Sequence, residues 1–133
     1  MTASNEFDLR EFLPYLLNIA GEQTSSSFQG FYKAKYGLLR TDWRVLFHLG
    51  IYGELTAKEI CERAHVHKTK VSRAVVRLEE RRFLQRKSVE HDRRFEKLKL
   101  TTLGRKTYSE LKDAASEYDN KILSSFSKEE VRL

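Results

Sequence analysis

Apolar residues recur at intervals of three and four over most of the chain, which is the spacing of one face of an α-helix. The first repeat predicts a long amphipathic helix over about residues 10–36. Its apolar positions include Leu13, Leu16, Leu17 and Ala20. Gly37 is a typical end signal, because glycine readily adopts the left-handed conformation that often follows a helix.

Three shorter helices are predicted in the middle of the chain. Thr41 is a good N-cap for the first, which ends in a turn at Gly50 and Gly53. Thr56 and Glu59 form a capping box for the second, in which each side chain satisfies the other residue's backbone N–H. The third extends over about 68–82 and has an apolar face and a basic face. These faces carry Val71, Val75 and Leu78 on one side and Lys70, Arg73 and Arg77 on the other.

Alternating apolar positions then indicate a β-hairpin. Phe83 and Leu84 begin an extended segment, the polar residues 88–95 form the expected tip, and Leu98 and Leu100 lie on the return strand. A long C-terminal helix follows the hairpin, and its apolar repeat extends to residue 122. Residues 127–130 form another helix start signal with only three residues after it, so we expect either a truncated C-terminus or a further, disordered tail.

The positive charge of the chain is confined to one segment. The net charge is +6, and residues 67–97 contain eleven basic and five acidic side chains, so the remaining residues are neutral overall. A local basic patch on a neutral body is typical of nucleic-acid binding, whereas the alternative is an ordinary solvated charged face. A helix, a short turn, a helix and a basic hairpin together predict a winged helix-turn-helix, which favours double-stranded DNA as the partner. One helix of this motif fits the major groove, and the hairpin reaches the adjacent minor groove.

Other classes of protein lack support in the sequence. No apolar stretch is long enough for a transmembrane helix, and the first ten residues carry no signal-peptide pattern, so we expect no membrane association and a cytoplasmic location. Cys61 is the only cysteine and there are four histidines, which argues against a disulfide, a metal site or another cofactor. We find no catalytic motif and expect no enzyme activity.

Two motifs resemble the MarR family of bacterial transcriptional regulators, and the likeness centres on residues 38–105. The first motif is Leu55–Ala64 followed by Val66–Glu79, and the second is Asp92–Arg94 followed by Leu98–Thr101 and Gly104. The resemblance implies a mainly α fold, a winged helix-turn-helix with a three-helix core and a β-hairpin wing. It implies that residues 1–133 form one MarR-type domain, with a DNA-binding lobe at 38–101. Long dimerisation helices at 10–36 and 102–133 would then build a homodimer, which also explains their surplus apolar faces.

The resemblance assigns DNA contacts to one face of the helix predicted over about 68–82 and to the hairpin tip. The expected contact residues are His67, Lys68, Thr69, Lys70, Ser72, Arg73, Arg77, Arg93 and Arg94. Arginine suits base-edge recognition because its fork matches the O6 and N7 atoms of guanine. Arg94 would enter the minor groove, and Asp92 would hold the tip in shape as a scaffold. His67 is a poor N-cap by type, so it contacts a phosphate or is simply a solvent-exposed loop residue.

Members of this family commonly respond to small, often aromatic, anionic ligands, which implies an effector pocket. The candidates for its wall are Phe28, Tyr32, Tyr36, Trp43, Phe47 and His48, although the same aromatic zone also suits core and dimer packing. The leading hypothesis is therefore a DNA-binding transcriptional regulator, a repressor that a small ligand releases from a pseudo-palindromic operator. The alternatives are an effector-independent architectural DNA-binding protein and an RNA-binding winged helix. Cys61 lies on an apolar helix face and is interpreted as an inert thiol.

Overall fold

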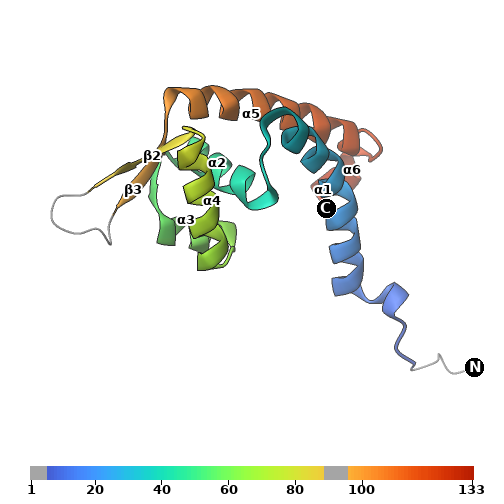
Figure 1. The fold of residues 1–133 in the computed structure, drawn as a ribbon. Helices are drawn as coiled ribbons and strands as arrows, with labels where there is room; N and C mark the ends of the chain where they lie inside the picture. Colours follow the sequence, from blue (N-terminus) through green and yellow to red (C-terminus); the bar gives the residue numbers. More distant parts are fainter. Residues whose placement is uncertain (1–5, 89–95) are drawn as a thin grey trace, which may run out of the picture.

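The computed structural model describes residues 6–88 and 96–133 and is mainly helical, with one small sheet (Figure 1). Figure 1 shows a lobe built around α2, α3 and α4, with the β2–β3 hairpin projecting from it. The long helix α5 crosses the lobe and runs on beside α1, whose N-terminal part extends away from the lobe. The expected winged helix-turn-helix is confirmed.

The first long helix, α1 (Leu13–Tyr36), is continuous and begins slightly later than predicted. A 3-10 turn, η1 (Leu9–Glu11), precedes it, because the carboxylate of Asp8 accepts hydrogen bonds from the backbone and side chain of Arg10. Gly37 ends the helix in the left-handed conformation, with a φ of 67°, as the sequence predicts.

The start of α2 (Arg40–Tyr52) corrects one prediction. Thr41 is not the N-cap; Leu39 occupies that position, and the carboxylate of Asp42 accepts its backbone N–H at 3.0 Å. An acidic side chain in the first turn thus reaches back and satisfies the backbone N–H of the N-cap residue, which is one half of a capping box. Gly53 ends the helix as predicted, but Gly50, which was expected in the same turn, lies within the helix.

The helix-turn-helix consists of α3 (Ala57–Ala64) and α4 (Lys68–Glu80). The predicted capping box of α3 is confirmed, with N–H to oxygen distances of 3.1 and 3.0 Å between Thr56 and Glu59. The cap of α4 is a correction, because His67 does act as the N-cap. Its Nδ1 accepts the backbone N–H of Thr69 at 3.2 Å, so an imidazole nitrogen replaces the usual oxygen.

The wing hairpin, β2 (Leu84–Lys87) and β3 (Lys97–Leu100), has the predicted strands. A third strand, β1 (Glu54–Thr56), was not predicted and pairs with β3, so the antiparallel sheet has the order β1-β3-β2. Leu55 lies opposite Leu98 and Leu84 lies opposite Leu100. These leucines are buried, which fixes the base of the wing against the helices.

The remaining helices are α5 (Thr102–Leu123) and α6 (Lys128–Arg132). The hydroxyl of Thr101 caps α5 by accepting the N–H of Gly104 at 3.0 Å. The core lies in the lobe and includes Leu38, Leu46, Leu49, Ile60, Leu78 and Leu111. By contrast, large apolar side chains at the start of α1 are exposed, among them Phe12, Leu13, Leu16 and Leu17. Within the described ranges we find no helix of the length and apolar character that crossing a membrane requires.

Candidate nucleic-acid interface and ligand pocket

One face of α4 is packed into the core and the other is open to solvent. Val71, Ala74, Val75 and Leu78 are buried, which fixes the helix in the lobe. The N-terminal half of the opposite face is exposed and carries five of the predicted contact residues. These are Lys68, Thr69, Lys70, Ser72 and Arg73. No side chain of the described ranges forms an ion pair with any of the three cations in this group.

Arg77 differs from these residues, although it belongs to the same basic stripe in the sequence. Its Nε and Nη2 atoms donate to Oδ1 of Asp42 at 3.0 and 2.7 Å. The Asp42 side chain is only 3% exposed, so the guanidinium neutralises a buried carboxylate. Arg77 therefore differs from the other cations of the stripe, because its guanidinium joins α4 to α2, and its contact with DNA stays a prediction.

The C-terminal end of α4 is tied to its surroundings by two more arginines. Nη1 of Arg81 donates to the carbonyl oxygen of Tyr36 at 2.5 Å. Arg86 on β2 donates to Glu79 at 3.0 Å and to Glu96 at 3.3 Å, which connects the base of the wing to α4. Burial alone would lower the pKa of Arg86, but the hydrogen bonds and negative charges of both glutamates outweigh it and raise the pKa. This guanidinium therefore stays charged and holds the wing.

The wing-tip residues Asp92, Arg93 and Arg94 lie outside the described residues, so their assignments stay predictions. His67 is exposed and its ring caps α4, which leaves Nε2 as the ring nitrogen that the cap does not use. The described part of the candidate interface is thus the first two turns of α4, with the base of the wing beside it (Figure 1).

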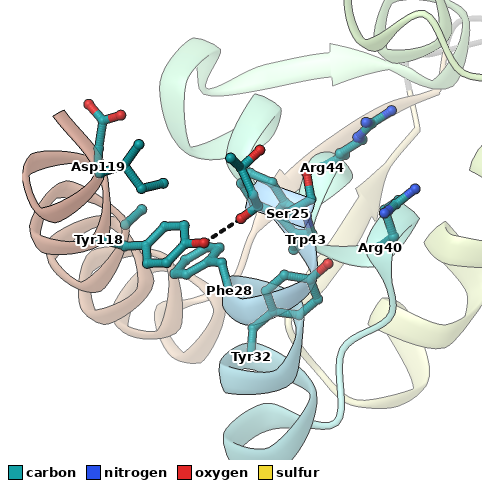
Figure 2. Close-up of a pocket in the computed structure, with 11 residues that line it drawn as sticks. Ser25, Phe28, Tyr32, Arg40, Trp43, Arg44, Tyr118 and Asp119 are labelled. Carbon is teal, nitrogen blue, oxygen red and sulfur yellow. Dashed lines mark hydrogen bonds between the residues drawn. The ribbon is translucent and has the colours of Figure 1, made fainter. Parts of the chain in front are cut away.

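A pocket of about 330 Å³ opens between α1, α2 and the C-terminal half of α5 (Figure 2). Phe28, Tyr32 and Trp43 form its aromatic wall, with ring centroids 5.6 to 5.8 Å apart. The other lining residues are Thr24, Ser25, Arg40, Arg44, Ala115, Tyr118, Asp119 and Ile122. Figure 2 shows Arg40 and Arg44 on the α2 side and Asp119 on the α5 side. The pocket therefore combines aromatic surface with two cationic groups.

The positive charge of this pocket lies on the α2 side, and the carboxylate of Asp119 lies on the α5 side. Burial raises the pKa of Tyr32, and the positive charges of Arg40 and Arg44 act against that rise. The Tyr118 hydroxyl donates to the carbonyl oxygen of Thr24, which joins α5 to α1 along one side of the pocket. Both arginines are exposed and lie one helical turn apart, so each guanidinium is able to meet a small ligand.

Three of the six predicted pocket residues do not line it. The Tyr36 hydroxyl donates to Glu110, and this contact together with burial raises the Tyr36 pKa to about 12. Phe47 packs between Trp43 and Tyr108, with centroid distances of 4.7 and 5.1 Å. His48 places Nδ1 2.7 Å from the carbonyl oxygen of Arg44. These side chains support the packing around the pocket instead.

Sequence reasoning missed the two arginines and the contribution of α5. Arg40 and Arg44 flank Trp43 on one helix at a spacing of four, and this pattern was available as a signal. Nothing local indicated that Tyr118 and Asp119 would meet α1 and α2, because that contact depends on how the long helices cross.

Comparison with known proteins agrees with this architecture. The model of the MarR family matches residues 36–94. The chain is 33% identical over 95 residues to an uncharacterised HTH-type transcriptional regulator, YwoH, of Bacillus subtilis (strain 168), and the match covers 71% of this chain and 69% of the relative.

Solved structures share the fold. A MarR/EmrR family transcriptional regulator from Acinetobacter sp. ADP1 superposes with a TM-score of 0.84 at 23% identity, covering 95% of this chain and 89% of that one. NadR in complex with 4-hydroxyphenylacetate gives a TM-score of 0.77 at 22% identity, covering 98% and 88%. With the family model, the curated relative and the winged-helix geometry in agreement, the chain belongs to the MarR family of transcriptional regulators.

Proposed function

We propose that this protein is a homodimeric repressor that binds a pseudo-palindromic DNA operator and leaves it when a small aromatic anion enters the pocket. The observation that carries the proposal is a set of cations on the exposed first turns of α4 that have no ion-pair partner among the residues that the structure describes. The other face of this helix is packed into the core. An anchored helix with free Lys and Arg side chains can enter the major groove and meet both phosphates and base edges. A repressor that acts by covering a promoter needs these DNA contacts and no contact with another protein.

The homodimer is supported by the apolar surface of the long helices. Four large apolar side chains at the start of α1 are 44 to 64% exposed, namely Phe12, Leu13, Leu16 and Leu17. Phe7, Phe126 and Val131 near the two chain ends are also about half exposed or more. A second copy of the chain would bury this surface and would present two α4 helices with two-fold symmetry. Such a dimer suits two half-sites one helical turn apart.

The ligand class is supported by the pocket. Aromatic walls favour a planar ring, and Arg40 and Arg44 favour a carboxylate, since arginine pairs with carboxylates through parallel hydrogen bonds. The structural neighbour NadR was solved with 4-hydroxyphenylacetate, a molecule of this chemistry. We infer that a small aromatic acid is the effector class.

We predict that Arg73→Ala lowers DNA affinity by roughly 5- to 150-fold, which corresponds to about 1–3 kcal/mol for a base-contacting arginine. Duplexes selected by the wild-type protein from a random library provide the substrate, and sedimentation first tests for a mass of twice 15.7 kDa. Fluorescence anisotropy then gives the dissociation constants at several salt concentrations. Arg105→Ala, an exposed arginine on α5, is the matched control and should bind like the wild type.

Three results of this experiment would contradict the proposal or its contact face. An affinity that does not change with salt would exclude binding through phosphate contacts. A stronger preference for structured RNA than for any duplex would instead support the RNA-binding alternative. If Arg73→Ala binds as tightly as the wild type, the contact face of α4 is misplaced.

We predict that 4-hydroxyphenylacetate releases the protein from its selected duplex, whereas 4-hydroxyphenylethanol, which has the same ring and no carboxylate, does not. The effect should depend on Arg44, because a charge-assisted hydrogen bond contributes about 1.5–3 kcal/mol. Arg44→Met should therefore raise the concentration needed for half-release by about tenfold or more. Lys112→Met, on an exposed position of α5 outside the pocket, is the control. Release by neither compound, nor by any member of a panel of aromatic acids, would favour the effector-independent architectural protein.

A further inference from the structure

Arg81 at the C-terminal end of α4 contacts the end of α1, far from it in the sequence. Its Nη1 donates to the carbonyl oxygen of Tyr36, the last residue of α1, at 2.5 Å. The next residue, Gly37, leaves the space that the guanidinium occupies: a Cβ there would lie 2.5 Å from Nη2 of Arg81 and 2.8 Å from Nη1. Glycine at this position therefore permits both the left-handed turn and the approach of Arg81.

A second arginine of α4 holds the other side of the same turn. Arg77, one helical turn before Arg81, binds Asp42 in the first turn of α2. Asp42 also accepts the backbone N–H of Leu39, so its carboxylate closes the start of α2. We refer to residues 36–42 as the α1–α2 corner. Two guanidinium groups of α4 thus fasten its C-terminal end to both sides of this corner.

The corner is also the place where the pocket and the long helices meet. The Tyr36 hydroxyl donates to Glu110 on α5, and the pocket residues Arg40 and Trp43 lie at and just after the start of α2. Toward its N-terminal end, the same helix carries Lys70 and Arg73, which form no ion pair with any residue in the described ranges. Movement of α4 relative to the corner would therefore displace those cations.

We propose that Arg81 is a positioning residue for DNA recognition, which fixes the direction of α4 relative to the α1–α2 corner without contacting DNA itself. The inference rests on the proposed homodimer, in which the long helices set the distance between the two α4 helices. One added base pair moves a half-site by about 3.4 Å and rotates it by about 35°. An α4 fastened at both sides of the corner rejects that change, whereas an α4 held there by Arg77 alone adapts to it. Arg81 therefore makes the protein selective for one half-site spacing.

The experiment measures binding to duplexes with the same two half-sites and a spacer shortened by one base pair or lengthened by one or two. The half-sites come from duplexes that the wild-type protein selects from a random library. Arg81→Met keeps the aliphatic part of the side chain and removes its hydrogen-bond donors. Arg81→Lys keeps the charge and one donor group. Arg82→Met is the matched control, because within the described residues the Arg82 side chain has no hydrogen bond or ion pair.

We expect a one-base-pair change to weaken wild-type and Arg82→Met binding by about 30-fold or more. For Arg81→Met the same change should cost about threefold or less, and Arg81→Lys should lie between these values. Circular dichroism checks that each variant is folded; if Arg81→Met is not, Arg81→Lys alone decides the outcome. Equal spacing selectivity in the wild type and the folded Arg81 variants would overturn the inference while the proposed function stands. A wild-type protein that selects no duplex would overturn the proposed function itself, and the inference with it.

Discussion

Replacing Gly104 by alanine is expected to lower the free energy of unfolding by about 3 kcal/mol. A Cβ at this position would overlap the carbonyl oxygen of Phe83 and come within 2.8 Å of the carbonyl carbon. These are backbone atoms, so no rotation of a side chain relieves the clash. The same Phe83 carbonyl accepts the N–H of Thr101 at 3.1 Å, and Thr101 caps α5. The substitution therefore forces the start of α5 away from the lobe, and overpacking of this kind costs about 1–3 kcal/mol or more.

Gly21 provides the matched control for this substitution. It lies within α1, and a Cβ there would meet nothing within 4 Å beyond its chain neighbours and the backbone of its own helix. Gly21→Ala is expected to raise stability by about 0.5–1 kcal/mol, because alanine loses less backbone entropy than glycine in a helix. Urea unfolding followed by circular dichroism, at one protein concentration for all variants, measures both changes. If Gly104→Ala and Gly21→Ala change the free energy of unfolding equally, the close contact between α5 and the Phe83 carbonyl does not limit stability.

Local signals in the sequence predicted local structure well. The capping box of Thr56 and Glu59 is correct because both groups lie within one helical turn. His67 shows where a statistical preference fails, since its ring accepts the N–H of Thr69 although histidine is an uncommon N-cap. The strand β1 was missed because it is only three residues long and its partner, β3, lies about forty residues further along the chain. Pairings of this kind leave no local pattern.

The sequence predicted only those features of the candidate site that depend on residues close together in the chain. Helical spacing placed Arg73 and Arg77 on one face, and that placement is geometrically sound. It could not show that a buried carboxylate from α2 would meet the second of them and not the first. The pocket also depends on a tertiary contact that helical spacing does not reveal, because Arg44 and Tyr118 come together only where α2 and α5 cross. Tertiary contacts therefore decide which members of a regular pattern are available to a partner.

Arg77→Ala is expected to lower the free energy of unfolding by about 3 kcal/mol. This is a much larger effect than we expect for Arg73→Ala, one helical turn earlier on the same basic face of α4. The substitution removes the cation from a carboxylate whose side chain is only 3% exposed and leaves an uncompensated charge in the lobe. Breaking a buried pair in this way costs about 3–5 kcal/mol, and the Arg77 side chain is 37% exposed, so water entry keeps the cost at the lower end.

Two further variants separate the cost of the stranded charge from the loss of a contact. Asp42→Asn in the Arg77→Ala background should recover at least 1 kcal/mol, because the neutral amide oxygen can still accept the Leu39 N–H while the buried charge disappears. Arg73→Ala should change stability by less than about 0.5 kcal/mol, as expected for an exposed residue without such a partner. Urea unfolding of the four proteins gives the comparison. If Arg77→Ala is as stable as Arg73→Ala, the guanidinium of Arg77 is not needed by Asp42 and is available to contact DNA.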